Sequence, residues 1–158
     1  MLLLFITLDT GKAVFVKTSL QSAAAAAATI GARSGTIGDR TAYTESCPPA
    51  TQSQATGQNQ NDNLIFLSLC RSAPWESMGA EISEVTIALV AADNRVYDGS
   101  SRVCTKDYPY VRVRVKAKMQ NMLVPGISRD GGFGLTVSSL LDSVEVESTV
   151  FCEVYREA

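Results

Sequence analysis

"MLLLFITLDTGKAVFVKTSLQSAAAAAATIGAR", residues 1–33, decides the fold because it reads as one continuous helix. Its first eight residues are largely apolar, and the remainder is amphipathic, with apolar residues near helical spacing at Leu8, Phe15, Val16, Leu20 and Ile30. No proline interrupts the run, alanine is the best helix former, and Gly35 is a natural stop. Such a helix is about 50 Å long. We therefore expect it to project from a small domain.

Polar loops and short apolar segments follow the helix. Residues 34–63 are rich in Gly, Ser, Thr, Gln and Asn without a hydrophobic period, so they predict a loop. Residues 64–70 are apolar and fit a helical turn or a strand equally well. From residue 81 the period changes to two, which predicts a strand with Val85, Ile87 and Leu89 on one face. Asp93-Asn94 is a turn signal, and Val96-Tyr97 is expected to begin a partner strand.

Two later segments show clear strand alternation. "YVRVRVKAKMQ" (110–120) and "SVEVESTVFCEVYRE" (143–157) each place apolar residues at every second position. The predicted fold class is α+β, with a long N-terminal helix packed on and projecting from a C-terminal antiparallel sheet. The helix domain spans residues 1–33. The globular domain spans 34–158 and contains the polar loop 34–63 and a sheet at about 81–156.

The charged faces of these two strands predict cross-strand pairing. The first carries Arg112, Arg114, Lys116 and Lys118, and the second carries Glu145, Glu147 and Glu153. If the strands are neighbours, each exposed pair adds a few tenths of a kcal/mol and helps to fix the register. We prefer this structural interpretation to a nucleic-acid or lipid patch, because the net charge of the chain is −2.

Catalytic and cofactor motifs are absent from the sequence. The chain has no histidine, so a Ser-His-Asp triad cannot form and the commonest metal ligand is missing. The "GGFG" at 131–134 has neither the GxGxxG nor the GK[ST] pattern of phosphate loops. We therefore expect no enzyme activity, no cofactor and no metal.

The four cysteines, Cys47, Cys70, Cys104 and Cys152, include no CxxC pair. Zinc sites normally draw ligands from close pairs, so two disulfides fit this spacing better. Four cysteines allow three pairings; we favour Cys47–Cys70, closing the polar loop, and Cys104–Cys152, joining two C-terminal strands. Disulfides indicate an oxidising compartment outside the cytoplasm. The alternative is four buried free thiols in a cytosolic protein.

The helix segment resembles the TadE/TadG-like pilin family, a group of type IV pilin-like subunits. The residues that carry the resemblance are Asp9, Gly11, Lys12, Ala13, Leu20, Gln21, Ala23–Ala28 and Gly31-Ala32-Arg33. The C-terminal "YPYVRVRVKAKM…LVPG…GLTVSSLLDSVEVES" is also similar to the family's alternating strand, proline-containing turn and closing strand. The similarity covers roughly residues 1–33 and 108–150.

The resemblance implies a structural subunit of an extracellular pilus-like filament, anchored in the membrane before assembly. Its partners would be copies of itself or other pilins, and the inner-membrane assembly machinery, but no nucleic acid. The side chains expected to pack against neighbouring helices are Leu2, Leu3, Leu4, Phe5, Ile6, Val14, Phe15, Val16 and Leu20. The alternative function is a membrane-tethered periplasmic or cell-surface binding module that uses the loop 34–63 and the "PWE" segment at 74–76.

The sequence departs from the family at its start. Pilin precursors carry a basic leader and a peptidase site, followed by about twenty apolar residues with a glutamate, and "MLLLFITL" has neither leader nor glutamate. Eight apolar residues are too few to cross a bilayer, which takes about twenty. We expect a mature or truncated form that lacks upstream residues; the alternative is that Met1 ends a shortened helix.

The unbroken run Ala23–Ala28 predicts close packing, because small side chains let another backbone approach. The approaching partner is either the protein's own sheet or the helix of a neighbouring copy, and the sequence leaves both open.

Overall fold

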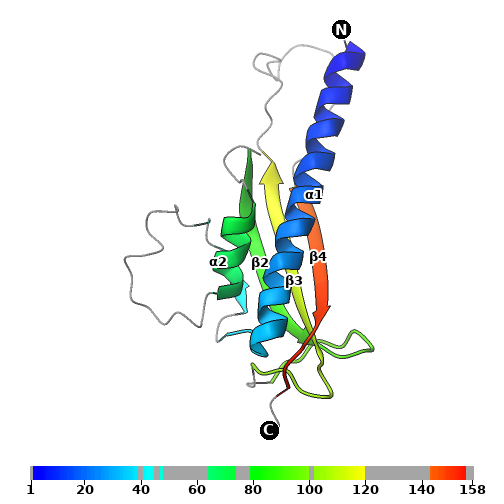
Figure 1. The fold of residues 1–158 in the computed structure, drawn as a ribbon. Helices are drawn as coiled ribbons and strands as arrows, with labels where there is room; N and C mark the ends of the chain where they lie inside the picture. The colour runs from blue at the N-terminus through cyan, green and yellow to red at the C-terminus, as the bar shows by residue number, and fades with distance from the viewer. Residues whose placement is uncertain are drawn as a thin grey trace, which may run out of the picture.

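A computed structural model of the chain describes residues 2–38, 41–44, 47, 64–73, 79–99, 102–119 and 143–155, with the backbone alone for residues 2–10. Its elements are α1 (Leu2–Ser34), β1 (Ala42–Tyr43), α2 (Leu64–Ser72), β2 (Ala80–Val90), β3 (Tyr110–Met119) and β4 (Ser143–Phe151). The strands form one antiparallel sheet in the order β1-β2-β3-β4. Figure 1 shows both helices on the same face of this sheet. The expected α+β architecture is confirmed.

The long helix ends where the sequence predicts. Gly35 follows Ser34 with a φ of 65°, a left-handed conformation that costs glycine little. Beyond it, the Gly35 carbonyl accepts a hydrogen bond from the N–H of Cys104 (2.9 Å), and the N–H of Ile37 donates to the Arg102 carbonyl (2.9 Å). The chain that leaves α1 is therefore fixed at once to the segment that precedes β3.

One core lies between the helices and the sheet. The side chains that share this core are Val16, Leu20, Ala23, Ala24, Ala27, Ala28, Ala32, Ile65, Phe66, Leu69, Val85, Ile87, Leu89, Val111, Val113, Val115, Ala117 and Val146. The strand residues of this set fall on every second position, as the alternation predicts. Burying each larger aliphatic side chain contributes about 1.5–3 kcal/mol.

The cross-strand register agrees with the charge pattern. Arg114 lies opposite Glu147 and Lys116 lies opposite Glu145 in the β3–β4 pair. Because Val113 and Val115 face the helices, these charged residues lie on the opposite face, which we call the outer face of the sheet. The prediction that β3 and β4 are neighbours is confirmed.

The segments between residues 34 and 72 differ in detail from the sequence-based expectation. Within the expected loop 34–63, the structure forms strand β1, and its Tyr43 is buried and stacks on Phe66 of α2 with ring centroids 4.5 Å apart. The ambiguous apolar segment is the helix α2. Only Ala42 and Tyr43 separate the polar residues Thr41 and Thr44, so no local period marks this strand. Its pairing with β2 comes from burial of the ring.

The expected partner strand at Val96-Tyr97 forms only in part. The turn at Asp93-Asn94 does form, with Asn94 at a φ of 67°. The N–H of Arg95, and then its guanidinium, hydrogen-bond the Asp93 carboxylate and lower the pKa of Asp93. After this turn, Val96 makes an isolated antiparallel bridge to Val90 and the N–H of Tyr97 donates to the Leu89 carbonyl (2.9 Å), but the described residues there form no extended strand. Further along the same edge of β2, the Thr41 carbonyl already accepts the N–H of Ile87 (2.7 Å). Strand β3 occupies the other edge.

All four cysteines are paired, as Cys47–Cys70 and Cys104–Cys152. The Cα atoms are 5.4 Å and 6.4 Å apart, within the usual range for disulfides. These are the two pairs that the sequence favours. The first disulfide joins the segment after β1 to α2 itself. The second joins the end of β4 to the segment before β3.

Candidate functional site

The helix α1 changes its surroundings near Val16. From Val16 onward one face of the helix is buried against the sheet and α2, whereas Val14 and Phe15 are 57% and 55% exposed. Figure 1 shows that the N-terminal end of α1 continues beyond the end of the sheet. Exposed valine and phenylalanine beside an apolar sequence indicate a surface that the described residues do not cover.

The residues expected to mediate assembly divide into three sets. The first set lies at the projecting N-terminal end of α1, and its side chains fall outside the described residues. Its members are Leu2, Leu3, Leu4, Phe5 and Ile6. Val14 and Phe15 are exposed and free to contact another molecule. Val16 and Leu20, by contrast, are fully buried in the protein's own core. This burial revises the expectation for Val16 and Leu20, which stabilise the fold and cannot reach a neighbour.

The alanine run packs on the protein itself. Ala23, Ala24, Ala27 and Ala28 are fully buried, and the helix contacts α2, β3 and β4. One turn later, a Cβ placed on Gly31 would lie 2.7 Å from Cδ1 of Ile65 in α2. Of the two partners that the sequence left open, the small residues therefore serve the close approach of α1 to its own sheet and to α2.

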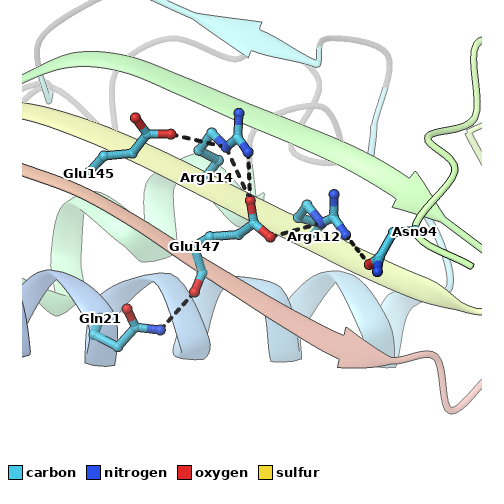
Figure 2. Close-up of polar contacts among 6 residues, drawn as sticks. All are labelled: Gln21, Asn94, Arg112, Arg114, Glu145 and Glu147. Atoms are coloured by element: carbon cyan, nitrogen blue, oxygen red, sulfur yellow. Dashed lines mark hydrogen bonds and ion pairs between the residues drawn. The ribbon is translucent and has the colours of Figure 1, made fainter. Parts of the chain in front are cut away.

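Two contacts fix the position of α1 on the sheet. The Gln21 side-chain amide donates to the Glu147 carbonyl of β4 (2.8 Å), as Figure 2 shows. At the other end of the packed region, the N–H of Glu153 donates to the Ala32 carbonyl (3.1 Å), and Arg33 lies 3.6 Å from the Glu153 carboxylate. The Ala32 carbonyl is one of the last in the helix and has no partner within it, so this bond satisfies a group that would otherwise be orphaned.

The charges on the outer face of the sheet are paired with one another (Figure 2). Glu147 contacts Arg114 (2.9 Å) and Arg112 (3.2 Å), and Glu145 contacts Arg114 (3.2 Å). The contact between Glu147 and Arg112 Nε is an ion pair that lacks hydrogen-bond geometry. The Arg112 guanidinium donates a hydrogen bond to the Asn94 side-chain oxygen instead (2.7 Å). Because Arg112, Arg114 and Lys116 already have acidic partners, the described residues of this face form no broad cationic surface for phosphate groups.

An aromatic cluster at the end of the outer face was not anticipated from the sequence. Phe151 lies between Tyr110 and Tyr155, with ring centroids 5.4 Å and 5.8 Å away, in edge-to-face geometry. Despite these neighbours, Phe151 is 53% exposed. We call Tyr110, Phe151 and Tyr155 the aromatic patch. The available signal was Phe151 itself, a large apolar residue on the polar side of the β4 alternation.

One helical stretch within the described residues has the length and composition of a membrane span. It covers Gly11–Ser34, has a mean hydropathy of 1.2 and is 33% buried inside the molecule. The buried part is the alanine-rich face described above. A helix that belongs to a protein core has the same composition as a membrane span, so this stretch is an apolar N-terminal helix with two possible environments.

Comparisons of the chain with protein-family models, curated proteins and solved structures found no match.

Proposed function

We propose that the protein is a structural, non-enzymatic subunit of an extracellular pilus-like filament of the Tad or type IV-like kind. The observation that carries this proposal is the division of α1. From Val16 onward α1 is packed on the sheet, while its apolar N-terminal end extends beyond the sheet and Val14 and Phe15, just before the packed region, are exposed. Burial of such a surface against the same helix of neighbouring copies is favourable by about 25 cal/mol per Å² of apolar area.

The location and the partners follow from the same proposal. Two disulfides are typical of a protein that folds in an oxidising compartment, so the filament is extracellular and the subunit is held in the membrane before assembly. Its partners are other copies or related pilins and, before assembly, the inner-membrane machinery. A net charge of −2 and an outer face of paired charges argue against nucleic acid as a partner.

The alternative function, a membrane-tethered binding module, places its ligand contacts mainly on residues 34–63 and 74–76. Most of these lie outside the described residues. No described contact favours a ligand there, so the filament subunit remains our single proposal.

Substitution of the exposed helix residues tests the proposal. Val14→Asp combined with Phe15→Asp places two carboxylates on the expected contact surface, and we expect loss of sheared filaments from the native source. The matched control is Leu64→Asp, because Leu64 is also an exposed apolar side chain but lies on α2. Filament yield is measured by sedimentation and electron microscopy. Wild-type yield from the double variant, with both disulfides intact, would contradict the proposal.

A further inference from the structure

Strand β4 lies at the end of the sheet, with β3 on one side and no described strand on the other. The N–H of Cys152 donates to the Pro109 carbonyl (2.8 Å), so the even-numbered residues of β4 direct their backbone groups towards β3. The odd-numbered residues direct theirs away from the sheet. The two contacts of this segment with α1 agree, because they use the carbonyl of Glu147 and the N–H of Glu153.

The outward backbone groups of β4 are largely unpaired. Within the described part of the chain, the outward N–H and C=O groups of Glu145, Thr149 and Phe151 have no hydrogen-bond partner. The carbonyl of Glu147 accepts from Gln21 and has a second lone pair. We call this side of residues 145–151 the open edge. A row of donors and acceptors at strand spacing is matched by another β-strand.

The acidic residues of the open edge do not exclude a partner strand. Charged side chains on an edge strand normally discourage pairing with another chain. Here Glu145 and Glu147 both contact Arg114, and Glu147 also contacts Arg112. The charge of both carboxylates is therefore compensated within β3 and β4. A partner strand is disfavoured only where it places another glutamate directly opposite one of them.

The residue pattern of β4 fits a second copy of β4 as the partner. In an antiparallel pair of two open edges centred on Ser148, no glutamate lies opposite a glutamate. Moving one strand by two residues in one direction brings the two Glu147 residues together, and the opposite shift shortens the overlap. The facing pairs in the centred register are Ser148–Ser148, Glu147–Thr149, Glu145–Phe151 and Val146–Val150.

We infer that β4 pairs with β4 of a second copy of this chain in this register, so that the two sheets become continuous. Figure 1 shows that α1 and β4 run in the same direction. The two-fold axis that relates the copies therefore makes their α1 helices antiparallel. Subunits of one filament share the direction of α1, so the paired copies belong to two filaments that lie side by side and point in opposite directions. The pairing itself goes beyond the proposed function, and only this last step rests on it.

Oxidative crosslinking tests the register. All four native cysteines are in disulfides, so mild oxidation joins only introduced thiols. The two Ser148 residues face each other on the axis at a position without hydrogen bonds, where Cα atoms are about 4.5 Å apart. Ser148→Cys in the full-length protein should therefore give a disulfide-linked dimer in sheared filaments. The matched control is Ser143→Cys on the same strand, whose two copies lie about 34 Å apart in this register and should give no dimer.

A proline tests the hydrogen bonds of the open edge. The Thr149 N–H points outward, so Thr149→Pro leaves the β3–β4 ladder in place and removes a donor that only the second copy uses. We expect Thr149→Pro filaments to lie singly in electron micrographs, whereas wild-type filaments lie in side-by-side pairs. Thr149→Val retains the N–H and should keep the pairs. Both disulfides, measured by mass spectrometry without reduction, report that the fold of each variant is retained.

Failure of the pairing and failure of the filament give different results. Equal dimer yields from Ser148→Cys and Ser143→Cys, or paired filaments that persist in Thr149→Pro, would overturn the inference and leave the filament proposal intact. Absence of filaments from the wild-type protein would contradict the proposed function instead. The Ser148→Cys oxidation is then repeated on full-length protein extracted in detergent, where a dimer supports the pairing and a monomer overturns it.

Discussion

Gly31 lies in α1 at a point where the side chain of Ile65 in α2 comes close to the helix backbone. A Cβ at this position would lie 2.7 Å from Ile65 Cδ1 and 3.1 Å from Val111 Cγ1. Cβ atoms do not approach other carbons so closely, so the terminal methyl of Ile65 would have to move and the Val111 methyl would have to give way. In a well-packed core such overpacking costs about 1–3 kcal/mol. At most positions in a helix, glycine is about 1 kcal/mol less favourable than alanine.

Gly31→Ala and Gly11→Ala should therefore have opposite effects, although both replace glycine by alanine in α1. Gly11 has open space around its Cα, so its substitution should stabilise the helix by up to about 1 kcal/mol. Gly31→Ala should lower the free energy of unfolding by about 1–2 kcal/mol, because the overpacking exceeds the gain in helix propensity. Urea denaturation followed by circular dichroism measures both variants. Stabilisation by Gly31→Ala would show that α2 can move away from α1 without cost.

Among the elements, the β3–β4 pair depends most directly on one charged residue. Glu147 contacts both Arg112 and Arg114, and the Arg112 side chain is only 16% exposed. Another ion pair on this face, Glu84–Lys116, involves a single contact between side chains that are 44% and 41% exposed. The two glutamates therefore differ in burial and in number of partners, while the chemistry of the pairs is similar.

Glu147→Gln should destabilise the protein more than Glu84→Gln. The first substitution removes a carboxylate from two arginines, one of them mostly buried, and we expect a loss of about 1–2 kcal/mol. The second should cost less than about 0.5 kcal/mol, because exposed ion pairs contribute little and are screened by salt. Chemical denaturation at low and high salt measures both. Equal losses for the two variants would contradict the role assigned to Glu147.

The elements also show how far local sequence patterns reach. Periodicity and charge over consecutive residues predict the end of α1, the strands β2, β3 and β4, and the pairing of the basic face of β3 with the acidic face of β4. They do not predict strand β1, since two residues cannot establish a period. It is held by contacts distant in sequence, with β2 and with Phe66. The partner strand expected at Val96 begins beside β2 but does not extend, because the Thr41 carbonyl already accepts the N–H of Ile87 further along that edge, and alternation in sequence cannot show this.

The candidate site was only partly predictable. An apolar N-terminal helix indicates that some of its residues are exposed for contacts, but the sequence cannot separate Phe15 from Val16, which are adjacent. The structure separates them because only Val16 faces the sheet. The aromatic patch needed the β3–β4 register, since Tyr110 and Phe151 are distant in sequence and meet only across the strands.

For the whole molecule, the two disulfides should differ in their contribution to stability. Cys104–Cys152 joins residues 48 apart and is fully buried, while Cys47–Cys70 joins residues 23 apart and is partly exposed. By the entropy of loop closure, removal costs about 4 kcal/mol for the longer loop and about 3 kcal/mol for the shorter. Cys104→Ala/Cys152→Ala should thus be the less stable double variant in urea denaturation. A reversed order would show that the longer loop is already constrained in the unfolded chain.

The bond between Cys104 and Cys152 has a mechanical consequence. If tension enters the subunit along the projecting end of α1, it is applied parallel to the buried alanine face, so the helix must slide over the sheet and cannot peel away one turn at a time. Once the contact between α1 and the sheet breaks, the disulfide still encloses β3 and β4 in a covalent loop whose two cysteines are 48 residues apart in sequence. The loop withholds roughly 160–170 Å of contour length from extension. The strand pair thus remains short under a load that draws out the rest of the chain.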